Sequence, residues 1–392
     1  MKILYFSPHP HINLAAPSGP GTHMREVIAA FEEAGNTVVR CIAGGEVIEK
    51  KDAAIAFKKH RWKKFIPGFL WETLRDIQMM RIDEHIETRL KALIEKEKPD
   101  LIYERSCYGM GAGMRAAKKF GIRYVVEMNA PYPEEKAKMQ GSSLLRFMGT
   151  RHEKKQVLNA HKTIVVSSAM KSYLIQKTGV HPDKIVVVAN AVNPQHITPN
   201  KLLQEKIRQR FSIQPTHTVI GFVGSIFPYH GVDLMIDAFA ALEKQNEALR
   251  MLIVGDGEIV PDLQKHVCDL NLQHKIHFTG NVPHSEVYDY LSLMDIAVMA
   301  RSNWYGSPVK IFEYGAMQKA IIAPDVIPVR DVMIHEKDGL LVEATQEALT
   351  RSMRFMIEQP DARKRMAQAF HEKVMKEYTW QKATQHILAA CQ

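Results

Sequence analysis

Residues 219–242 read VIGFVGSIFPYHGVDLMIDAFAAL, and this stretch constrains the fold more than any other. An apolar run is followed by a Gly-Ser turn, a loop that contains His230 and Gly231, and a segment with apolar residues at helical spacing. This order predicts a buried strand, a tight turn and a helix that packs back on the strand. The helix N-terminus, the Ser225 hydroxyl and the His230 imidazole would together suit a diphosphate.

The same alternation of apolar run, turn and helical segment recurs along the chain. Continuous apolar strands that alternate with helices indicate parallel sheets covered on both faces, so each half is predicted to be a doubly wound α/β unit. The runs expected to form strands are 3–6, 37–42, 101–103, 124–126, 163–167, 185–188, 219–223, 251–254, 276–278, 296–299, 320–323 and 340–342.

The length of the chain and a proline-containing stretch without periodicity predict two domains. A chain of 392 residues exceeds the size at which one core keeps growing. The stretch AVNPQHITPN, residues 191–200, has two prolines and no periodicity, so the domains are expected at 1–192 and 193–374. Residues 362–390 have a helical pattern, and about 375–392 are expected to return to the first domain. Ligands of such sheets bind beyond the carboxyl ends of the strands, which predicts an interdomain cleft as the site.

Composition excludes several classes of protein. With 46% hydrophobic and 24% charged residues, the chain has the composition of a soluble globular protein rather than a disordered one. Its four cysteines are far apart and form no metal-ligand pattern, so no structural zinc and no other metal is expected. No stretch approaches the roughly 18 apolar residues of a membrane span. We expect a cytoplasmic protein, at most peripheral on the inner face of the membrane.

The net charge of +9 is unevenly distributed. Residues 1–190 contain 31 Lys and Arg against 20 Asp and Glu, whereas residues 191–392 contain 21 against 23. Part of the excess lies in KKHRWKKFIPGFLWETL, residues 58–74, where cations alternate with aromatic side chains. This pattern suits docking on an anionic membrane; a solvated basic loop is the alternative. The residues expected to dock are Lys58, Lys59, Arg61, Trp62, Lys63, Lys64, Phe65 and Trp71.

A glycine loop follows the first predicted strand. Ser18-Gly19-Pro20-Gly21-Thr22 leads into a helix, where backbone N–H groups could approach an anion, although a plain loop explains the same residues. Ser18, Gly19, Gly21 and His23 are therefore candidates for an acceptor or phosphate loop. Nearby, His9 and His11 lack the further ligands that a metal site needs, and are assigned to a loop or to the acceptor side.

Three later loops complete a family pattern. They are MLIVGDGEIVPDL (251–263), FTGNVPHSEVYDYL (278–291) and SNWYGSPVKIFEYGAMQKAIIAP (302–324). With DGLLV (338–342) and the stretch quoted first, they resemble, in order, the nucleotide-sugar-binding domain of the retaining glycosyltransferases of family 4, which have two facing Rossmann-like domains (GT-B). The first half agrees more loosely, through its glycine loop, YVVEMNAPYPEE, VVSSAMKSYL and KIVVVANAVNP.

The resemblance implies transfer of a sugar from a UDP- or GDP-sugar with retention, without a metal or other cofactor. It implies that Glu313 accepts hydrogen bonds from the ribose, while the family's partner glutamate falls on Tyr305. The usual cations of the diphosphate clamp fall on Ser225 and His230, which leaves Lys310 and Arg301. The implied donor-side residues are Gly224, Ser225, His230, Gly231, Gly255, Gly257, Asn281, Val282, Pro283, Arg301, Ser307, Pro308, Lys310, Ile311 and Glu313.

Catalysis is expected to involve Lys310 and Glu313 together with Asn129 and Glu127. Many members carry a histidine where Asn129 stands, and Asn129 or Glu127 would hold the transferred sugar or the acceptor. A lipid-linked or cell-surface glycan is the expected acceptor. Alternatives are a nucleotide-sugar epimerase or phosphorylase of the same architecture and, because of the basic charge, a nucleic-acid-binding protein, although no nucleic-acid module is present and no nucleic-acid partner is expected.

Overall fold

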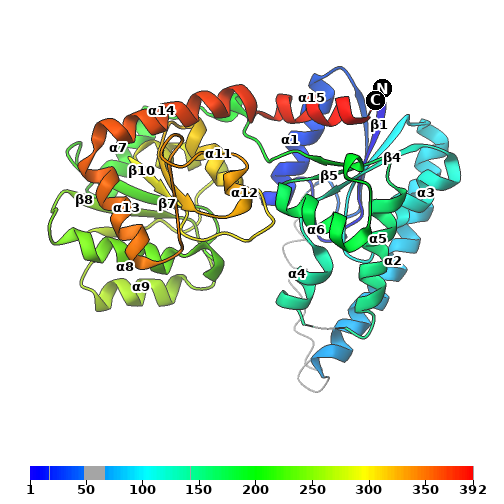
Figure 1. Cartoon of the computed structure of the whole chain (residues 1–392), viewed down its shortest axis with the longest axis horizontal. Helices are drawn as coiled ribbons and strands as arrows, with labels where there is room; N and C mark the ends of the chain where they lie inside the picture. The colour runs from blue at the N-terminus through cyan, green and yellow to red at the C-terminus, as the bar shows by residue number, and fades with distance from the viewer. Residues whose placement is uncertain (17, 48–66, 142, 392) are drawn as a thin grey trace. The chain divides into compact units, whose positions relative to one another are not determined.

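The computed structural model describes residues 1–16, 18–47, 67–141 and 143–391, and the chain divides into two compact units (Figure 1). The first unit comprises Met1–Val188 and Trp380–Gln392, and the second comprises Ala189–Thr379. These limits lie a few residues from the domain boundaries that the sequence predicts. In each unit the predicted runs form parallel strands, which confirms the two doubly wound α/β sheets.

The described part of the first unit forms a parallel sheet in the order β2-β1-β3-β4-β5-β6. Ile3, Leu4 and Phe6 of β1 are fully buried, as expected for a central strand covered by helices on both faces. The strands are β1 (Lys2–Ser7), β2 (Thr37–Ile42), β3 (Leu101–Arg105), β4 (Arg123–Met128), β5 (Lys162–Val165) and β6 (Ile185–Val187). The helices are α1 (Gly19–Glu33), α2 (Gly68–Glu97), α3 (Ala112–Phe120), α4 (Tyr132–Met139), α5 (Arg146–Asn159), α6 (Ser168–Thr178), η3 (Pro182–Lys184) and α15 (Trp380–Cys391).

The second unit contains a parallel sheet in the order β12-β11-β10-β7-β8-β9. Its strands are β7 (Thr218–Val223), β8 (Leu249–Val254), β9 (Ile276–Phe278), β10 (Ile296–Val298), β11 (Ala320–Pro324) and β12 (Leu340–Val342). Its helices are η4 (Pro194–His196), α7 (Lys201–Arg210), η5 (Pro228–His230), α8 (Val232–Glu243), α9 (Val260–Asp269), η6 (His284–Glu286), α10 (Val287–Ser292), α11 (Val309–Ala316), α12 (Ile327–Arg330), α13 (Gln346–Glu358) and α14 (Pro360–Glu377).

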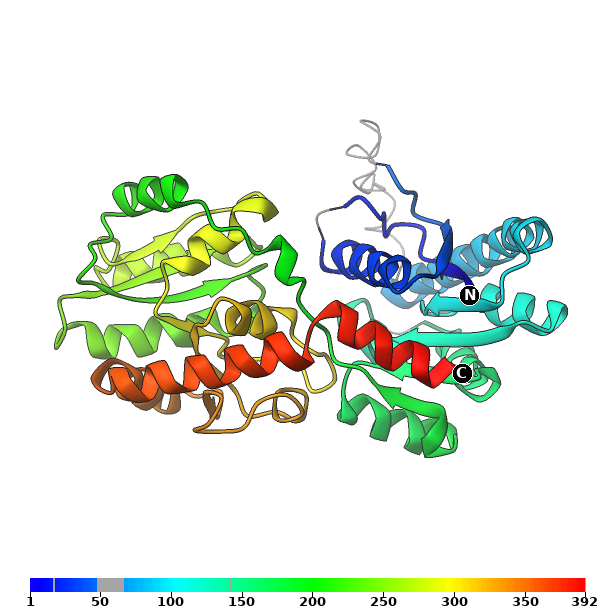
Figure 2. The ribbon, with the colours of Figure 1, turned by 90° about the horizontal axis from the view of Figure 1, so that it is seen from above.

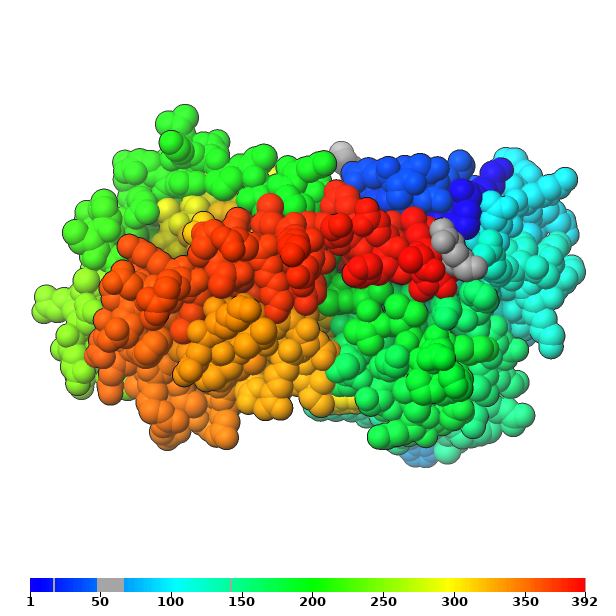
Figure 3. Space-filling view, turned by 45° about the horizontal axis from the view of Figure 1, so that its top comes forward, coloured from blue at the N-terminus to red at the C-terminus, as the bar shows by residue number. Residues whose placement is uncertain are grey.

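The core of the second unit lies on both faces of this sheet. On one face, Phe222 of β7 packs in a cluster with Phe239 of α8 and Leu349 of α13. On the other, Phe312 of α11 and Phe370 of α14 belong to a second cluster. Figure 3 shows α14 lying along the surface of this unit. The two clusters fix α8 and α11, whose first turns follow strands β7 and β10, against the sheet.

The C-terminal helical pattern is interrupted where the chain passes between the units. The stretch with a helical pattern, 362–390, is divided between two helices, since α14 ends at Glu377 and α15 begins at Trp380. In the gap, Val192 donates its N–H to the Tyr378 carbonyl at 3.0 Å and forms a bridge with Thr379. This pairing uses backbone groups that a continuous helix would need. Beyond it, α15 lies beside α1 (Figure 2). Among the described helices, none is long and apolar enough to cross a membrane.

Candidate functional site

The loops that follow β7 and β8 pack against each other through their backbones. Gly224 donates to the Val254 carbonyl at 2.9 Å, and Ile226 donates to the Asp256 carbonyl at 2.9 Å. A Cβ on Gly255 would lie 2.1 Å from the Gly224 oxygen, and one on Gly257 would lie 1.9 Å from the Ile226 oxygen. Both glycines, predicted as donor ligands, are therefore required for this close packing of the loops.

Lys310, in the first turn of α11, carries a buried ammonium group. Its Nζ lies 4.3 Å from the centre of the Phe222 ring and has no hydrogen-bond partner among the described residues. Gly224 lets it approach, because a Cβ there would lie 3.2 Å from Nζ. Burial lowers the pKa of Lys310 to about 7, although Glu313 opposes the shift. An uncompensated buried ammonium of this kind is suited to receive an anion.

His230 lies beside Lys310 but carries no charge at neutral pH. Its ring centre is 5.5 Å from that of Phe222 and 4.4 Å from that of Tyr229. Burial and the charge of Lys310 lower the pKa of His230 to about 3, against a backbone hydrogen bond with Ser225. The Nδ1 atom is buried without a partner in the described structure. His230 therefore contributes a hydrogen-bonding imidazole rather than the cation that the family pattern places here.

Helix α11 is held to the end of β7 by a buried tyrosine. The Tyr314 hydroxyl accepts the Val223 N–H at 3.0 Å, which fixes Glu313, its neighbour, at the strand ends. Burial raises the pKa of Glu313, and Lys310 partly offsets the rise. The side chain of Glu313 forms no hydrogen bond or ion pair within the part of the chain that the structure describes. Its carboxylate is thus available to accept hydrogen bonds from a vicinal diol.

Other predicted donor-side residues are already engaged. Ser307 accepts the Asn190 N–H on its hydroxyl at 3.0 Å and the Asn190 side-chain amide on its carbonyl at 2.7 Å. Arg301 is 3.3 Å from Asp233 at the start of α8, so its charge is compensated. Ile311, another predicted donor-side residue, is fully buried in the core of the second unit.

The other residues predicted for the donor side lie in or beside the loops after the strands, and they share no single role. Asn281 donates to Asp256 at 3.4 Å, and Val282 packs partly against the core. Pro283 precedes η6, and Pro308 precedes α11. Gly231, with φ of +72°, immediately precedes α8, and a Cβ there would lie 2.9 Å from Arg301 Cγ. Tyr305 stands where the family glutamate is expected, and its ring packs at 5.3 Å against that of Trp304.

The first unit contains a buried polar network at the ends of β3 and β4. Glu127 accepts hydrogen bonds from Tyr103 Oη at 2.8 Å, Arg105 Nη1 at 3.2 Å and Asn129 Nδ2 at 2.6 Å. Although burial raises the pKa of Glu127, His23, Arg105 and these hydrogen bonds hold it below its usual range. A carboxylate occupied by this many donors is a poor general base, so the structure favours Asn129 over Glu127 for contact with a ligand.

His23, which the sequence placed in a candidate anion loop, belongs to this network. Its Nε2 lies 3.1 Å from Glu127 and its Nδ1 lies 3.0 Å from Arg105. Burial lowers the pKa of His23 to about 4, so a neutral ring with its proton on Nε2 satisfies both neighbours. Ser18 caps α1 by accepting the Gly21 N–H at 3.3 Å. Gly21 itself leaves no room for a Cβ, which would lie 2.5 Å from the Ala16 oxygen, whereas Gly19 is open.

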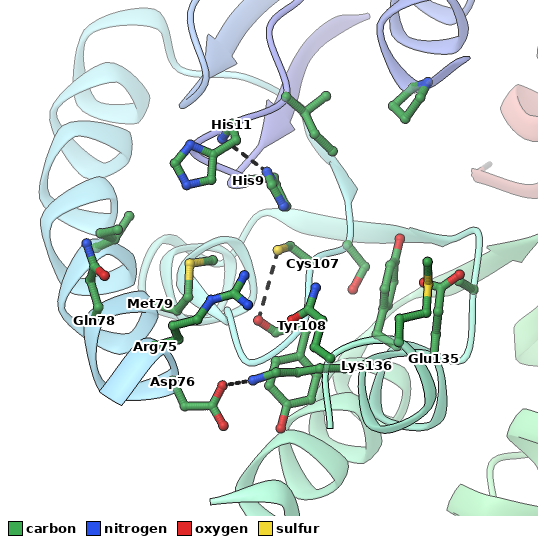
Figure 4. Close-up of a pocket in the computed structure, with 18 of the residues that line it drawn as sticks. His9, His11, Arg75, Asp76, Gln78, Met79, Cys107, Tyr108, Glu135 and Lys136 are labelled. Carbon is green, nitrogen blue, oxygen red and sulfur yellow. Dashed lines mark hydrogen bonds and ion pairs between the residues drawn. The ribbon is translucent and has the colours of Figure 1, made fainter. Parts of the chain in front are cut away.

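A cavity of about 810 Å³ lies over the ends of β1, β3 and β4, within the size range of small-molecule sites (Figure 4). Figure 4 shows His9 and His11 on one side of it and the Asp76–Lys136 ion pair on the other. Asn129 lines it, as do Arg75 and Arg105, which the sequence did not single out. Arg105 ends its strand, and the rule that sites follow strand ends would have found it.

Of the residues predicted to dock on a membrane, only Trp71 lies within the part of the chain that the structure describes. Trp71 lies on α2 and lines the cavity, whereas Lys58, Lys59, Arg61, Trp62, Lys63, Lys64 and Phe65 lie outside the described residues. Within the described residues, no group of three or more His, Cys, Asp or Glu side chains is arranged to hold a metal ion.

Comparisons with known proteins cover nearly the whole chain. Residues 17–196 match the family model described as Glycosyltransferase Family 4, and residues 204–373 match that described as Glycosyl transferases group 1. The phosphatidylinositol N-acetylglucosaminyltransferase GPI3 subunit of Saccharomyces cerevisiae is 26% identical over 57% of this chain and 48% of its own length, so the chain spans about half of that relative. An uncharacterised glycosyltransferase of Methanocaldococcus jannaschii is 24% identical over 76% of both chains.

Solved structures share the fold over the full length. Anabaena HepE, crystallised with UDP, superposes with a TM-score of 0.74 at 16% identity, covering 99% of both chains. The sucrose-phosphate synthase of Thermosynechococcus elongatus has a TM-score of 0.74 at 17% identity, covering 99% of this chain and 97% of its own. At these identities the likeness establishes the two-Rossmann-domain GT-B fold.

Proposed function

Because the chain belongs to glycosyltransferase family 4, we propose that it is a retaining hexosyltransferase that moves a sugar from a UDP- or GDP-sugar to a hydroxyl of a lipid-linked or cell-surface glycan. The assignment of a donor site rests on two side chains of α11. Among the described residues, the buried ammonium of Lys310 has no hydrogen-bond partner, and the carboxylate of Glu313 on the same short helix is available. The first fits a diphosphate and the second fits a ribose diol. The UDP bound in the Anabaena structure supports a nucleotide donor.

In this proposal the bond between the sugar and the diphosphate breaks, and the diphosphate leaves with the electron pair. Lys310 and the His230 imidazole stabilise the charge that develops on it. The acceptor hydroxyl attacks the same face of the sugar, and its proton passes to an oxygen of the leaving phosphate. Asn129 binds a sugar or the acceptor at the cavity of the first unit, with Glu127 as a positioning residue. The proposed reaction uses no metal or other cofactor.

A thermal-shift panel with UDP, GDP, ADP and dTDP tests the donor site. A nucleotide at 100 times its Kd should stabilise the protein by about 2.7 kcal/mol. Glu313→Ala should lose this response, whereas Glu347→Ala, an exposed residue in the same unit, should keep it. If no nucleotide shifts the melting temperature, the donor site is refuted.

Product analysis separates the transferase from the epimerase and phosphorylase alternatives. A transferase should release free nucleoside diphosphate only when an acceptor is present. An epimerase would convert the donor without any acceptor, and a phosphorylase would need inorganic phosphate. Nucleic-acid binding would instead be steeply dependent on salt, which a filter-binding series with DNA and RNA would detect.

We also propose that the basic, aromatic run before and into α2 docks on an anionic membrane. Each cation near such a surface contributes roughly 1 kcal/mol. Co-sedimentation with vesicles of phosphatidylcholine and phosphatidylglycerol should fall sharply when Lys58, Lys59, Lys63 and Lys64 are reversed to glutamate. Undiminished binding would rule out this role, and the same four reversals should leave the UDP response intact.

A further inference from the structure

The floor of the cavity in the first unit offers hydrogen bonds from the ends of two strands, β1 and β4. Ser7 at the end of β1 is 1% exposed, and its Oγ has no hydrogen-bond partner among the described residues, although the side chain lines the cavity. Asn129 lies beyond β4, and its amide nitrogen is held by Glu127. A buried hydroxyl without a partner is costly unless a ligand or water satisfies it. The floor is therefore built for a polar ligand.

The charges that line this cavity are matched within the protein. Arg105 is 3.2 Å from Glu127, Arg75 is 3.1 Å from Glu72, and Lys136 forms an ion pair with Asp76. A phosphate or carboxylate entering the cavity would have to compete with these carboxylates for each cation. The floor thus favours a ligand with hydroxyl groups over one with a net negative charge.

His9 adds a neutral donor to the same floor. Burial, with the nearby His11 and Arg105, lowers the pKa of His9 to about 4. Its Nδ1 accepts the backbone N–H of His11 at 3.1 Å, which places the ring proton on Nε2. A neutral N–H donor, an amide and a free hydroxyl together match the alternating donors and acceptors of a sugar or another polyol.

Exposed apolar side chains line the cavity beside the exposed polar residues Gln78 and Gln140. Leu74 on α2 and Met139 at the end of α4 line the cavity while remaining 53% and 70% exposed. Leu144, which is 61% exposed, donates its N–H to Thr73 Oγ1 of α2 at 3.0 Å, so a further exposed apolar side chain is held at this helix. Exposed apolar side chains beside a polar pocket are typical of a site for an amphiphile.

We propose that this cavity binds an amphiphilic glycoside or polyol without charge on its head group, its hydroxyls on the floor at Ser7, His9 and Asn129 and its apolar chain across Leu74 and Met139. The inference rests on the proposed function, in which this ligand is the sugar acceptor. It narrows the acceptor to a molecule whose lipid chain begins next to the accepting sugar.

Calorimetry with n-octyl β-D-glucopyranoside below its critical micelle concentration tests the class of ligand. Methyl β-D-glucopyranoside should bind at least about tenfold more weakly, because burying even two methylenes is worth that factor. Octyl phosphate, with the same chain and a charged head, should also bind more weakly than octyl glucoside. Tighter binding of octyl phosphate, or no binding of octyl glucoside, would overturn the inference.

Three variants locate the ligand. Leu74→Gln with Met139→Gln should weaken octyl glucoside about tenfold and leave methyl glucoside unchanged, whereas Leu202→Gln, at 77% exposure in the second unit, should change neither. Ser7→Ala should weaken both glucosides about fivefold without lowering the urea midpoint, since the hydroxyl has no partner among the described residues. Equal losses in the Leu74 and Met139 variant and in Leu202→Gln would mean nonspecific adsorption and would refute the site.

UDP titrations keep this inference separate from the proposed function. A protein that binds UDP but not octyl glucoside retains its donor site and loses the acceptor class argued here. A protein that binds octyl glucoside at the cavity but no nucleotide supports the ligand class and contradicts the glycosyltransferase proposal.

Discussion

Lys310 Nζ lies 4.3 Å from the centre of the Phe222 ring, with no hydrogen-bond acceptor in reach among the described residues. The ring face attracts the ammonium, but burial is the larger effect and lowers the pKa of Lys310 to about 7. Glu313 on the same helix and the neutral His230 are the titratable groups that interact with it. Binding of a diphosphate should therefore be linked to protonation of this side chain.

UDP affinity should fall as the pH rises above 7. Free Lys310 loses its proton in this range, while the phosphates of UDP keep their charge because their second pKa is about 6. Binding must then restore the proton, so Kd should approach a tenfold increase per pH unit between pH 8 and 9.5. Isothermal titration in buffers of different ionisation enthalpy measures the proton taken up. Lys310→Arg should bind UDP with little pH dependence, and a flat profile in the unmodified protein would contradict the linkage.

The same lysine should make the free protein more stable at alkaline pH. The folded pKa is about 7 and the ordinary value is about 10.4, so the unfolded chain binds more protons between these pH values. The contribution of Lys310 to the free energy of unfolding therefore rises with pH across this window and is least favourable below pH 7. Urea unfolding should show Lys310→Met more stable than the parent at pH 6.5, with a smaller margin at pH 9.5. Lys206→Met, at an exposed position, should show no such trend.

Gly257→Ala should disrupt the donor loops. The new Cβ would lie 1.9 Å from the backbone oxygen of Ile226, so the loops after β7 and β8 must separate. We expect a loss of about 2 kcal/mol or more in stability, together with weaker UDP binding. Gly280→Ala is the matched control, because its φ is +71° but no atom lies within 4 Å of the new Cβ, and it should cost only about 1 kcal/mol. Differential scanning calorimetry with and without UDP distinguishes them, and equal effects would argue against the packing role.

Glu127→Gln should destabilise the first unit by about 3 to 5 kcal/mol, because it leaves the charge of Arg105 buried without its partner. Glu32→Gln removes an exposed partner of Arg40 and should cost less than about 1 kcal/mol. Chemical denaturation at pH 7 measures both values. A loss below 1 kcal/mol for Glu127→Gln would show that Arg105 is compensated elsewhere.

The fold was predictable because buried parallel strands are recognisable in the sequence as short apolar runs. Runs such as Ile3–Phe6 are apolar without interruption, since helices cover both faces of the sheet. The break between α14 and α15 was not predictable, because the helical pattern continues across it. It depends on Val192 pairing with Tyr378 and Thr379, which are distant in sequence.

The candidate site was predictable in position but not in detail. Glycines and polar residues after strands pointed to the donor loops. The network around Glu127 could not be derived in this way, because it depends on strand register. Arg105 and Glu127 are direct neighbours in the β3–β4 pairing, and this contact occupies a carboxylate that was expected to hold a sugar or the acceptor.

The first unit is assembled from two separate pieces of the chain, since α15 joins residues that were synthesised some two hundred positions earlier. Trp380 packs edge-on against His23 at 5.0 Å, and Arg123 donates to the Cys391 carbonyl at 2.8 Å. The complete unit therefore requires α15 as well as residues 1–188. Expressed alone as residues 1–188, it would lack that helix, and a circular permutant that joins α15 directly to β1 is the better choice for studying it in isolation.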